Sequence, residues 1–228
     1  MNVLMTKKRT PSGREPAKRL KTARGRTTSS SRWLQRQLND PYVQKAQIDG
    51  YRSRAAYKIK DIDDKLGFFK PGVTVVDLGA APGGWAQVAM ERRVKKVVGI
   101  DLLPIDPMPG VVFLEMDFTD DEALVALERE IEDKKVDVVM SDIAPNAMGH
   151  KQTDHLRIMA LVEMAYDFAI NNLKPDGIFI AKVFQGGAQQ DIVATARKDF
   201  KTVRHIKPPS SRQDSSETFF IASGFRKT

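Results

Sequence analysis

The chain contains 228 residues, 41% of them hydrophobic and 29% charged, with a net charge of +8 and no cysteine. This length suits one domain with an appendage, and the lack of cysteine excludes disulfides, zinc–thiolate sites and thiol nucleophiles. No apolar run reaches the about 18 residues that a membrane-spanning helix needs, so we expect no membrane partner.

The basic charge is concentrated at the N-terminus. Residues 1–31 contain nine basic residues and one acid, Glu15, which accounts for the whole net charge of +8. The segment is rich in Ser, Thr, Gly and Pro, so we expect a disordered basic tail over residues 1–31 and a single domain over residues 32–228. We favour an arm that binds a polyanion. A passive solvating extension and a mitochondrial transit peptide are the alternatives, although prolines and glycines interrupt any amphipathic helix here.

Two helices are predicted after the tail. The first starts with Asp40 as its cap and Pro41 as its first residue, and it ends by Gly50. The second is predicted to start with Ser53 as its cap and to end at Gly67. Its apolar positions share one helical face, and Lys58 lies at the margin of that face.

From Pro71 onward, short β-branched runs alternate with helical stretches. Strands are predicted at 73–78, 96–101, 111–116, 136–142, 177–184, 201–206 and 218–223. Helices are predicted at 84–93, 120–134, 153–173 and 187–199. The last two strands are joined by a segment with no room for a helix, so they should pair antiparallel. The pattern predicts an α/β, Rossmann-like, seven-stranded and mostly parallel sheet with one antiparallel strand and helices on both faces. This arrangement matches the sheet of class I S-adenosylmethionine-dependent methyltransferases.

The first predicted strand ends in DLGAAPGGW, where small residues let a ligand approach the backbone closely. Gly79 and Gly83 lie in this turn, Asp101 ends the second strand, and Asp117 follows the third. Taken singly, each acid could be a local cap. In this order they indicate a nucleoside-bearing cofactor, with Asp101 at the ribose diol and Asp117 at the adenine amino group. A nicotinamide dinucleotide is the weaker alternative, because Ala81 stands where its fingerprint has a second glycine.

Two further charged residues reach the same edge of the predicted sheet. Asp142 ends the fourth strand, and Lys182 lies in the apolar run IFIAKVF of the fifth. Lysine is rarely buried without a partner, so Lys182 either escapes to solvent or has a function there. The residues after Asp142, 143–146, contain no aromatic ring of the kind that amino-directed methyltransferases stack on a base. An oxygen nucleophile is therefore favoured.

From Ser29 to the C-terminus the chain resembles the FtsJ-type ribosomal RNA ribose 2′-O-methyltransferases. The resemblance rests on YRSRAAYK, TVVDLGAAPGGW, DLLPIDP, MSDIAPN, AKVFQGG and SSRQDSSE. It implies a catalytic tetrad of Lys58, Asp142, Lys182 and Glu217. It also implies that the cofactor is bound by Gly83, Trp85, Asp101, Asp117 and Asp142. The chain departs from the family pattern in its longer basic tail and in the loop AMGHKQTD.

The resemblance implies S-adenosyl-L-methionine as cofactor and a uridine ribose of 23S ribosomal RNA, in the peptidyl-transferase A-loop, as substrate. It further implies a cytoplasmic monomer that acts on the 50S particle and supports ribosome assembly. The alternatives are the same chemistry on transfer RNA or a messenger cap, and a ribosome-assembly factor without turnover. We expect Lys182 to act as the base or to stabilise the alkoxide, with Asp142 holding its amine. Lys58 and Glu217 would orient the ribose; the alternative for all four residues is a set of surface salt bridges.

Three arginines, Arg32, Arg52 and Arg54, are expected to contact RNA phosphates. His150 and His155 flank Asp154, which raises the alternative of a metal, but no metal is expected because nothing else near them is metal-like. The apolar spacing of Leu161, Met164 and Phe168 predicts that all three face the core.

Deleting residues 1–28 should weaken RNA binding and flatten its salt dependence, because each phosphate contact that is lost removes about 0.7–0.9 from the slope of log affinity against log salt. Fluorescence anisotropy with labelled RNA over a range of salt concentrations measures this slope for the full and shortened chains. Equal slopes would show that the tail is passive.

Overall fold

The structure is a computed structural model that describes residues 34–131, 135–145, 149, 151–184 and 189–226. The chain divides into two compact units, Met1–Gly50 and Tyr51–Thr228. In the first unit, helix α2 (Pro41–Asp49) begins where the sequence predicts, with the Asp40 carboxylate accepting a hydrogen bond from the Tyr42 N–H, and it ends at Gly50 in the left-handed conformation. The predicted tail, including Arg32, lies outside the described residues.

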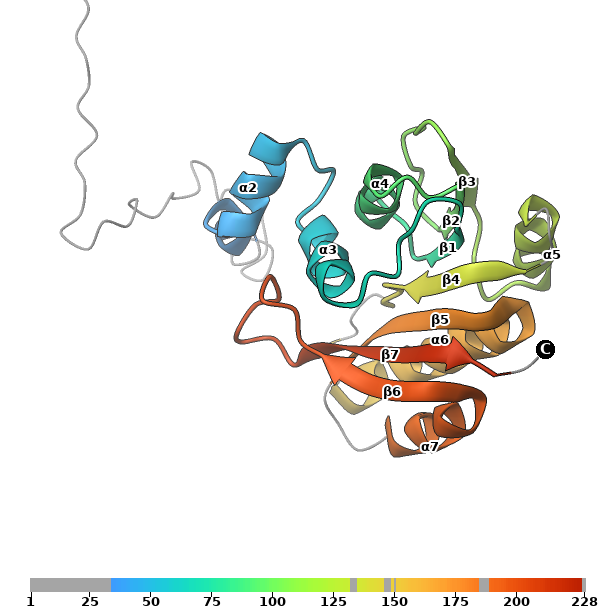
Figure 1. Ribbon diagram of the computed structural model, residues 1–228. Helices are drawn as coiled ribbons and strands as arrows, with labels where there is room; N and C mark the ends of the chain where they lie inside the picture. The colour runs from blue at the N-terminus through green and yellow to red at the C-terminus, as the bar shows by residue number, and fades with distance from the viewer. Residues whose placement is uncertain (1–33, 132–134, 146–148, 150, 185–188, 227–228) are drawn as a thin grey trace, which may run out of the picture. The chain divides into compact units, whose positions relative to one another are not determined.

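The second unit is built on one seven-stranded sheet (Figure 1). The strands are β1 (Thr74–Leu78), β2 (Lys96–Asp101), β3 (Val111–Glu115), β4 (Val136–Ser141), β5 (Leu173–Phe184), β6 (Phe200–Ile206) and β7 (Glu217–Phe225). Their order is β3-β2-β1-β4-β5-β7-β6. Strand β7 is antiparallel to both of its neighbours, and all other pairs are parallel. The predicted α/β class and the single antiparallel strand are confirmed.

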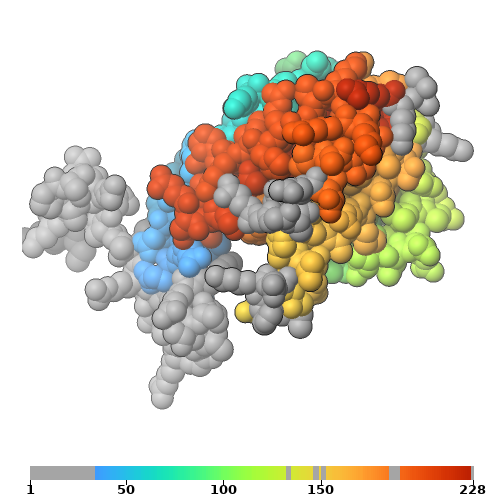
Figure 2. Space-filling view, turned by 90° about the horizontal axis from the view of Figure 1, so that it is seen from below, coloured from blue at the N-terminus to red at the C-terminus, as the bar shows by residue number. Residues whose placement is uncertain are grey.

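Helices cover both faces of this sheet, as predicted. They are α3 (Ala55–Leu66), α4 (Gly84–Glu91), α5 (Asp121–Glu130), α6 (Lys151–Asn172) and α7 (Gln189–Asp199). One face packs against α3 and α4, and the other against α5, α6 and α7. On the face seen in Figure 2, α6 in yellow-orange lies beside the orange-red segment from α7 onward. No helix of the described residues is long and apolar enough to span a membrane.

The prediction that Ser53 caps the second helix is wrong. The N-cap is Arg54, which makes no side-chain capping bond. The Ser53 hydroxyl instead packs against α4, where a Cβ on Gly84 would lie 2.7 Å from it. The residues before α3 run along the start of α4, and this tertiary contact draws Ser53 away from its own helix.

Strand alternation decides where Lys182 points. Ile180 packs with the α3–α4 side of the core, whereas Ala181 and Val183 pack with the opposite side. Because side chains alternate along a strand, Lys182 shares the α3–α4 face with Ile180. In the register of β5 and β7, Lys182 lies opposite Phe219. The lysine is therefore carried through the core on the face that α3 covers.

Replacing Asp63 with alanine should destabilise the protein by about 1–3 kcal/mol, because a buried N–H would lose its acceptor. The buried Asp63 carboxylate accepts hydrogen bonds from the Phe69 N–H and from Arg92 Nε, each at 2.9 Å. The matched control is Asp64→Ala, since the exposed Asp64 pairs with the same arginine. It should cost less than about 1 kcal/mol. Urea denaturation measures both, and equal losses would contradict the assignment.

Candidate active site

A cavity of about 720 Å³ opens at the carboxyl ends of the central strands. This is the edge at which parallel α/β sheets bind their ligands. Four of the residues predicted to bind a cofactor or to act in catalysis line it: Gly79, Asp101, Asp117 and Asp142, each at or just after the end of a strand. Ala81 of the glycine-rich turn lines it as well. The residues predicted at the ends of successive strands thus line one cavity.

Gly79 and Asp101 shape the inner wall of this cavity. Gly79 has a φ of 79°, and a Cβ there would lie 2.8 Å from the Ile143 nitrogen, so only glycine lets the two loops approach this closely. The Asp101 carboxylate accepts one hydrogen bond from the Ala81 N–H and another from the Leu103 N–H, both at 2.9 Å. Asp101 therefore joins the glycine-rich turn to the loop that follows its own strand.

Asp117 lies at the next strand end beside an apolar wall. One of its oxygens accepts hydrogen bonds from the Thr119 N–H at 2.9 Å and the Thr119 hydroxyl at 2.7 Å. These two bonds lower the pKa of Asp117, so it is ionised at neutral pH. Met116 and Phe118 flank it on the cavity wall. An acceptor next to apolar surface suits a flat heterocycle with an amino group.

Gly83 and Trp85 lie behind the cavity and not among the residues that line it. The Trp85 side chain is buried in the core, where its indole N–H donates to the Ala55 carbonyl at 2.9 Å and its ring lies 5.7 Å from that of Phe219. Trp85 thereby ties α4 to the start of α3. A contact between Trp85 and cofactor stays a prediction.

Lys182 and Asp142 form a buried ion pair. The Lys182 amine lies 2.7 Å from an Asp142 carboxylate oxygen and donates to the Asp142 carbonyl at 2.8 Å. Only 8% of Lys182 is exposed, and Asp142 offsets the cost of burying its amine. The Asp142 N–H donates to the Leu78 carbonyl at 3.0 Å, which fixes Asp142 to the end of β1. Asp142 thus contacts both the cavity and the lysine.

Lys58 and Glu217 form a second ion pair, 2.7 Å long, whose side chains are only 13% and 12% exposed. The Ser211 hydroxyl donates to the other Glu217 oxygen at 2.9 Å. The Lys58 amine lies 5.9 Å from the centre of the Phe219 ring, and Phe219 is the residue opposite Lys182. The four residues of the expected tetrad therefore gather around Phe219, and their burial disfavours the reading as surface salt bridges. Ser211 was not singled out from the sequence, although it lies in the SSRQDSSE segment.

Arg52 and Arg54 are the two expected RNA-binding arginines that the structure describes. Both donate to backbone carbonyls of the protein. Arg52 donates to the carbonyls of Pro82, Asp106 and Pro107. Arg54 donates to the Ser210 carbonyl. Both hold loops beside the candidate site. Their contact with RNA stays a prediction.

Helix α6 contributes a wall that the sequence did not reveal. Leu161 and Met164, both predicted to face the core, line the cavity together with Arg157, and Met164 also packs against the core. Phe168, one turn further on, is buried as predicted. The helical period cannot distinguish a core-facing residue from one that faces a cavity. Among the described residues, no group of three or more His, Asp or Glu side chains is arranged to hold a metal ion, and His150 lies outside them.

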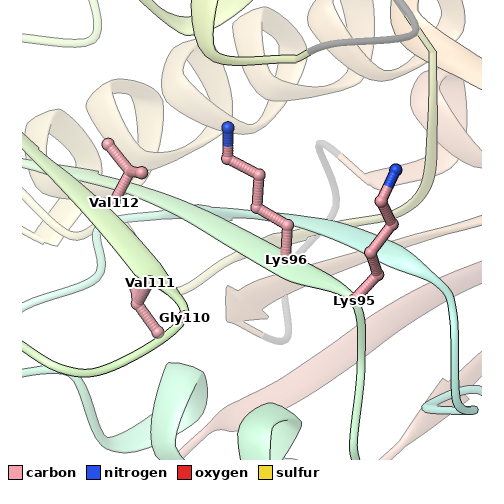
Figure 3. Close-up of a pocket in the computed structure, with 5 residues that line it drawn as sticks. All are labelled: Lys95, Lys96, Gly110, Val111 and Val112. Carbon is pink, nitrogen blue, oxygen red and sulfur yellow. The ribbon is translucent and has the colours of Figure 1, made fainter.

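A smaller hollow of about 310 Å³ lies at the opposite edge of the sheet, where β2 and β3 begin (Figure 3). The amines of Lys95 and Lys96 point the same way there. The Lys96 amine donates to the Glu130 carbonyl at 2.7 Å and lies 3.3 Å from the Glu130 carboxylate. Lys96 is thus paired with Glu130, and no Asp or Glu lines the hollow, so it lacks the carboxylates that line the larger cavity.

Comparison with known proteins agrees with this geometry. Residues 51–225 match the family model of FtsJ-like methyltransferases. The chain belongs to the FtsJ-like methyltransferase family. Its matched residues span all seven strands and both ion pairs around Phe219.

Relatives of this FtsJ-like methyltransferase include two bacterial proteins named ribosomal RNA large subunit methyltransferase E. The protein from Novosphingobium aromaticivorans is 56% identical over 94% of this chain and 97% of its own length. The protein from Caulobacter vibrioides is 55% identical over 94% of each. A crystal structure of a Plasmodium falciparum protein, described as a ribosomal RNA methyltransferase, is 30% identical. It covers 78% of this chain and 100% of its own, with a TM-score of 0.70.

Asp77 is a buried carboxyl group that the sequence reasoning did not assign. It lies within β1, fully buried, two residues before Gly79. Burial raises its pKa well above the ordinary value, and the charges of Asp142 and Asp101 raise it further, whereas the Ala86 N–H in the first turn of α4 lowers it. The folded protein therefore holds a proton on Asp77 to a higher pH than the unfolded chain does.

Replacing Asp77 with asparagine should remove a loss of stability that wild type shows as pH rises above about 4. In that range the unfolded chain releases the Asp77 proton and the folded protein keeps it. The wild-type free energy of unfolding then falls by up to about 1.4 kcal/mol per pH unit relative to the variant. Urea denaturation at several pH values measures the difference. Asp117→Asn is the matched control, because its lowered pKa gives the opposite sign. Parallel curves for Asp77→Asn and wild type would contradict the assignment.

Proposed function

We propose that this chain is an S-adenosyl-L-methionine-dependent methyltransferase that modifies the 2′-hydroxyl of a uridine ribose in 23S ribosomal RNA. The observation that carries the proposal is the pair of buried ion pairs, Lys182–Asp142 and Lys58–Glu217, of which Asp142 also lines the cavity. The names of the bacterial relatives support large-subunit ribosomal RNA as the substrate. The family resemblance supports the A-loop as the target, the 50S particle as the partner, and a cytoplasmic monomer.

The residues around the cavity fit S-adenosyl-L-methionine. Asp101 would accept hydrogen bonds from a ribose diol, and Asp117 would accept one from an adenine amino group beside the apolar Phe118. Asp142, at the end of β4, adds negative charge on the side of Lys182. Three carboxylates on one wall favour a cationic ligand, and the cavity of about 720 Å³ is within the usual range for cofactors. When bound, the cofactor supplies a methyl group that its sulfonium has already activated.

The task left to the protein is to orient the ribose and to remove the hydroxyl proton. Transfer would form a bond between the 2′-oxygen and the methyl carbon as the carbon–sulfur bond breaks. A neutral Lys182 amine would accept the hydroxyl proton. As an ammonium, Lys182 would instead stabilise the oxygen, and the proton would pass to water. Asp142 holds the lysine amine at two oxygens, so the amine stays in one place. Such assistance is typically worth about 10²–10⁴-fold in rate.

Lys58 and Glu217 would position the ribose. Glu217 is held on one oxygen by Lys58 and on the other by Ser211, and this leaves little rotational freedom for either partner. Fixed donors and acceptors beside the reacting hydroxyl reduce the entropy that must be lost in the transition state. Ser211 thereby supports the site through Glu217.

Replacing Lys182 with alanine should lower the rate of methyl transfer by about 10²–10⁴-fold and leave cofactor affinity within a few-fold, because Lys182 is not among the residues that line the cavity. The assay follows label from S-adenosyl-L-methionine into 50S subunits, naked ribosomal RNA or transfer RNA, with the modified nucleotide mapped afterwards. Lys174→Ala is the matched control: Lys174 lies in the same strand and also pairs with an aspartate, Asp137.

A Lys182→Ala rate within a few-fold of wild type, with folding intact, would overturn the role given to Lys182. Labelling of transfer RNA or capped messenger in place of ribosomal RNA would overturn the substrate. RNA binding with no transfer to any RNA would favour a non-catalytic assembly factor.

A further inference from the structure

Arg52 connects the two loops that border the cavity on its glycine-rich side. One terminal nitrogen of its guanidinium donates to the Pro82 carbonyl at 3.3 Å and to the Asp106 carbonyl at 2.7 Å. The other donates to the Pro107 carbonyl at 2.9 Å. Pro82 lies in the turn between β1 and α4, and the other two lie in the loop between β2 and β3. A single side chain thus links the two loops.

Both linked loops also supply the cavity wall. The first loop contributes Gly79 and Ala81, and the second contributes Leu102 and Leu103. A shift of one loop relative to the other would therefore change the width of the cavity where Asp101 lies between them. The link made by Arg52 sits behind this wall, since Arg52 is not among the residues that line the cavity.

Gly83 leaves the space that the Arg52 side chain fills. Its φ is 98°, and a Cβ there would lie 2.8 Å from an Arg52 terminal nitrogen and 3.3 Å from the Arg52 Cδ. The remaining contacts hold the arginine at both ends. The Arg52 N–H donates to the Gln87 side chain of α4 at 3.0 Å, and the guanidinium carbon lies 6.0 Å from the Phe113 ring of β3. The site is therefore built around this arginine.

The geometry requires arginine and not simply a positive charge. Guanidinium presents five donors in a planar fork, so it can bind three carbonyls in different directions at once. A lysine amine is a single point at the end of a flexible stem. It has no second terminal nitrogen for the Pro107 carbonyl, and its flexible stem would hold the two loops less rigidly.

We propose that Arg52 is a positioning residue that holds the two cofactor-binding loops at a fixed separation and so sets the affinity for S-adenosyl-L-methionine. The inference rests on the proposed function, because it takes the cavity to be the cofactor site. It differs from the expectation that Arg52 contacts RNA phosphates. Three of the five guanidinium N–H groups of Arg52 donate to backbone carbonyls, and its effect is exerted on the cofactor side.

Arg54, two residues further along, acts on the other half of the site. It donates to the Ser210 carbonyl, and the Ser210 N–H donates to Asp61 of α3 at 3.0 Å. The next residue, Ser211, donates to Glu217. Arg54 therefore supports the Lys58–Glu217 pair, whereas Arg52 supports the cofactor loops. This division allows the two arginines to be separated by experiment.

The test uses the full chain and isothermal titration with S-adenosyl-L-methionine and with S-adenosylhomocysteine. Arg52→Lys should raise the Kd for both ligands about tenfold or more, a change that corresponds to about 1.4 kcal/mol. The KM for S-adenosyl-L-methionine should rise in parallel, while kcat at saturating cofactor and the affinity for ribosomal RNA stay within about twofold. Arg52→Gln, measured in the same way, provides a second variant with a shorter side chain. Thermal melting verifies that each variant is folded at the temperature of the titration.

Two controls separate this role from a general loss of arginine. Arg54→Lys should leave the cofactor Kd within about twofold and lower kcat, because it acts on the Glu217 side. Arg129→Lys, at an exposed position on α5, should change neither. Weaker RNA binding by folded Arg52→Lys, with an unchanged cofactor Kd, would overturn the proposal in favour of a phosphate contact. Failure of wild type to bind either ligand would overturn the proposed function itself, which is distinguishable from an Arg52 variant that binds like wild type.

Discussion

The ion pair between Lys182 and Asp142 is the interaction on which the candidate site depends. A lysine inside an apolar strand is costly unless a carboxylate neutralises it and its donors are satisfied. Adjacent parallel strands end at one edge of a sheet, and Ser141 of β4 pairs with Ala181 of β5, so the next residues, Asp142 and Lys182, can form such a pair without distorting the core. The pair joins the buried interior to the cavity, because Asp142 contacts both. The remaining charged groups are arranged around it.

The short segment before α3 organises both halves of this site. Its two arginines reach in different directions, Arg52 to the loops that border the cavity and Arg54 to the loop that carries Ser211. Lys58, one turn into the same helix, meets Glu217. Helix α3 thus serves as the element that brings the proposed cofactor half and the proposed ribose half together. Its own anchor to α4 is the Trp85 indole bonded to Ala55.

The cavity concentrates negative charge in a partly buried place. Asp101, Asp117 and Asp142 line it, and the fully buried Asp77 lies directly behind. Burial raises the pKa of Asp77, and the charges of Asp142 and Asp101 raise it further. Such a wall is unfavourable in the empty protein and becomes favourable when a cation occupies the cavity. The proposed cofactor carries its positive charge where this electrostatic arrangement would stabilise it.

The sequence by itself determined the order of strands and helices, because alternation and helical period follow from local side-chain polarity. It also indicated the acids at the strand ends, since parallel strands place their last residues at a common edge. Only the tertiary structure decided what each side chain touches. It paired Lys58 with Glu217, 159 residues apart, recruited Ser211, turned Leu161 and Met164 toward the cavity, and directed Arg52 to backbone carbonyls. The physical reason is that a local pattern reports whether a residue is buried, whereas its partner depends on how distant segments pack.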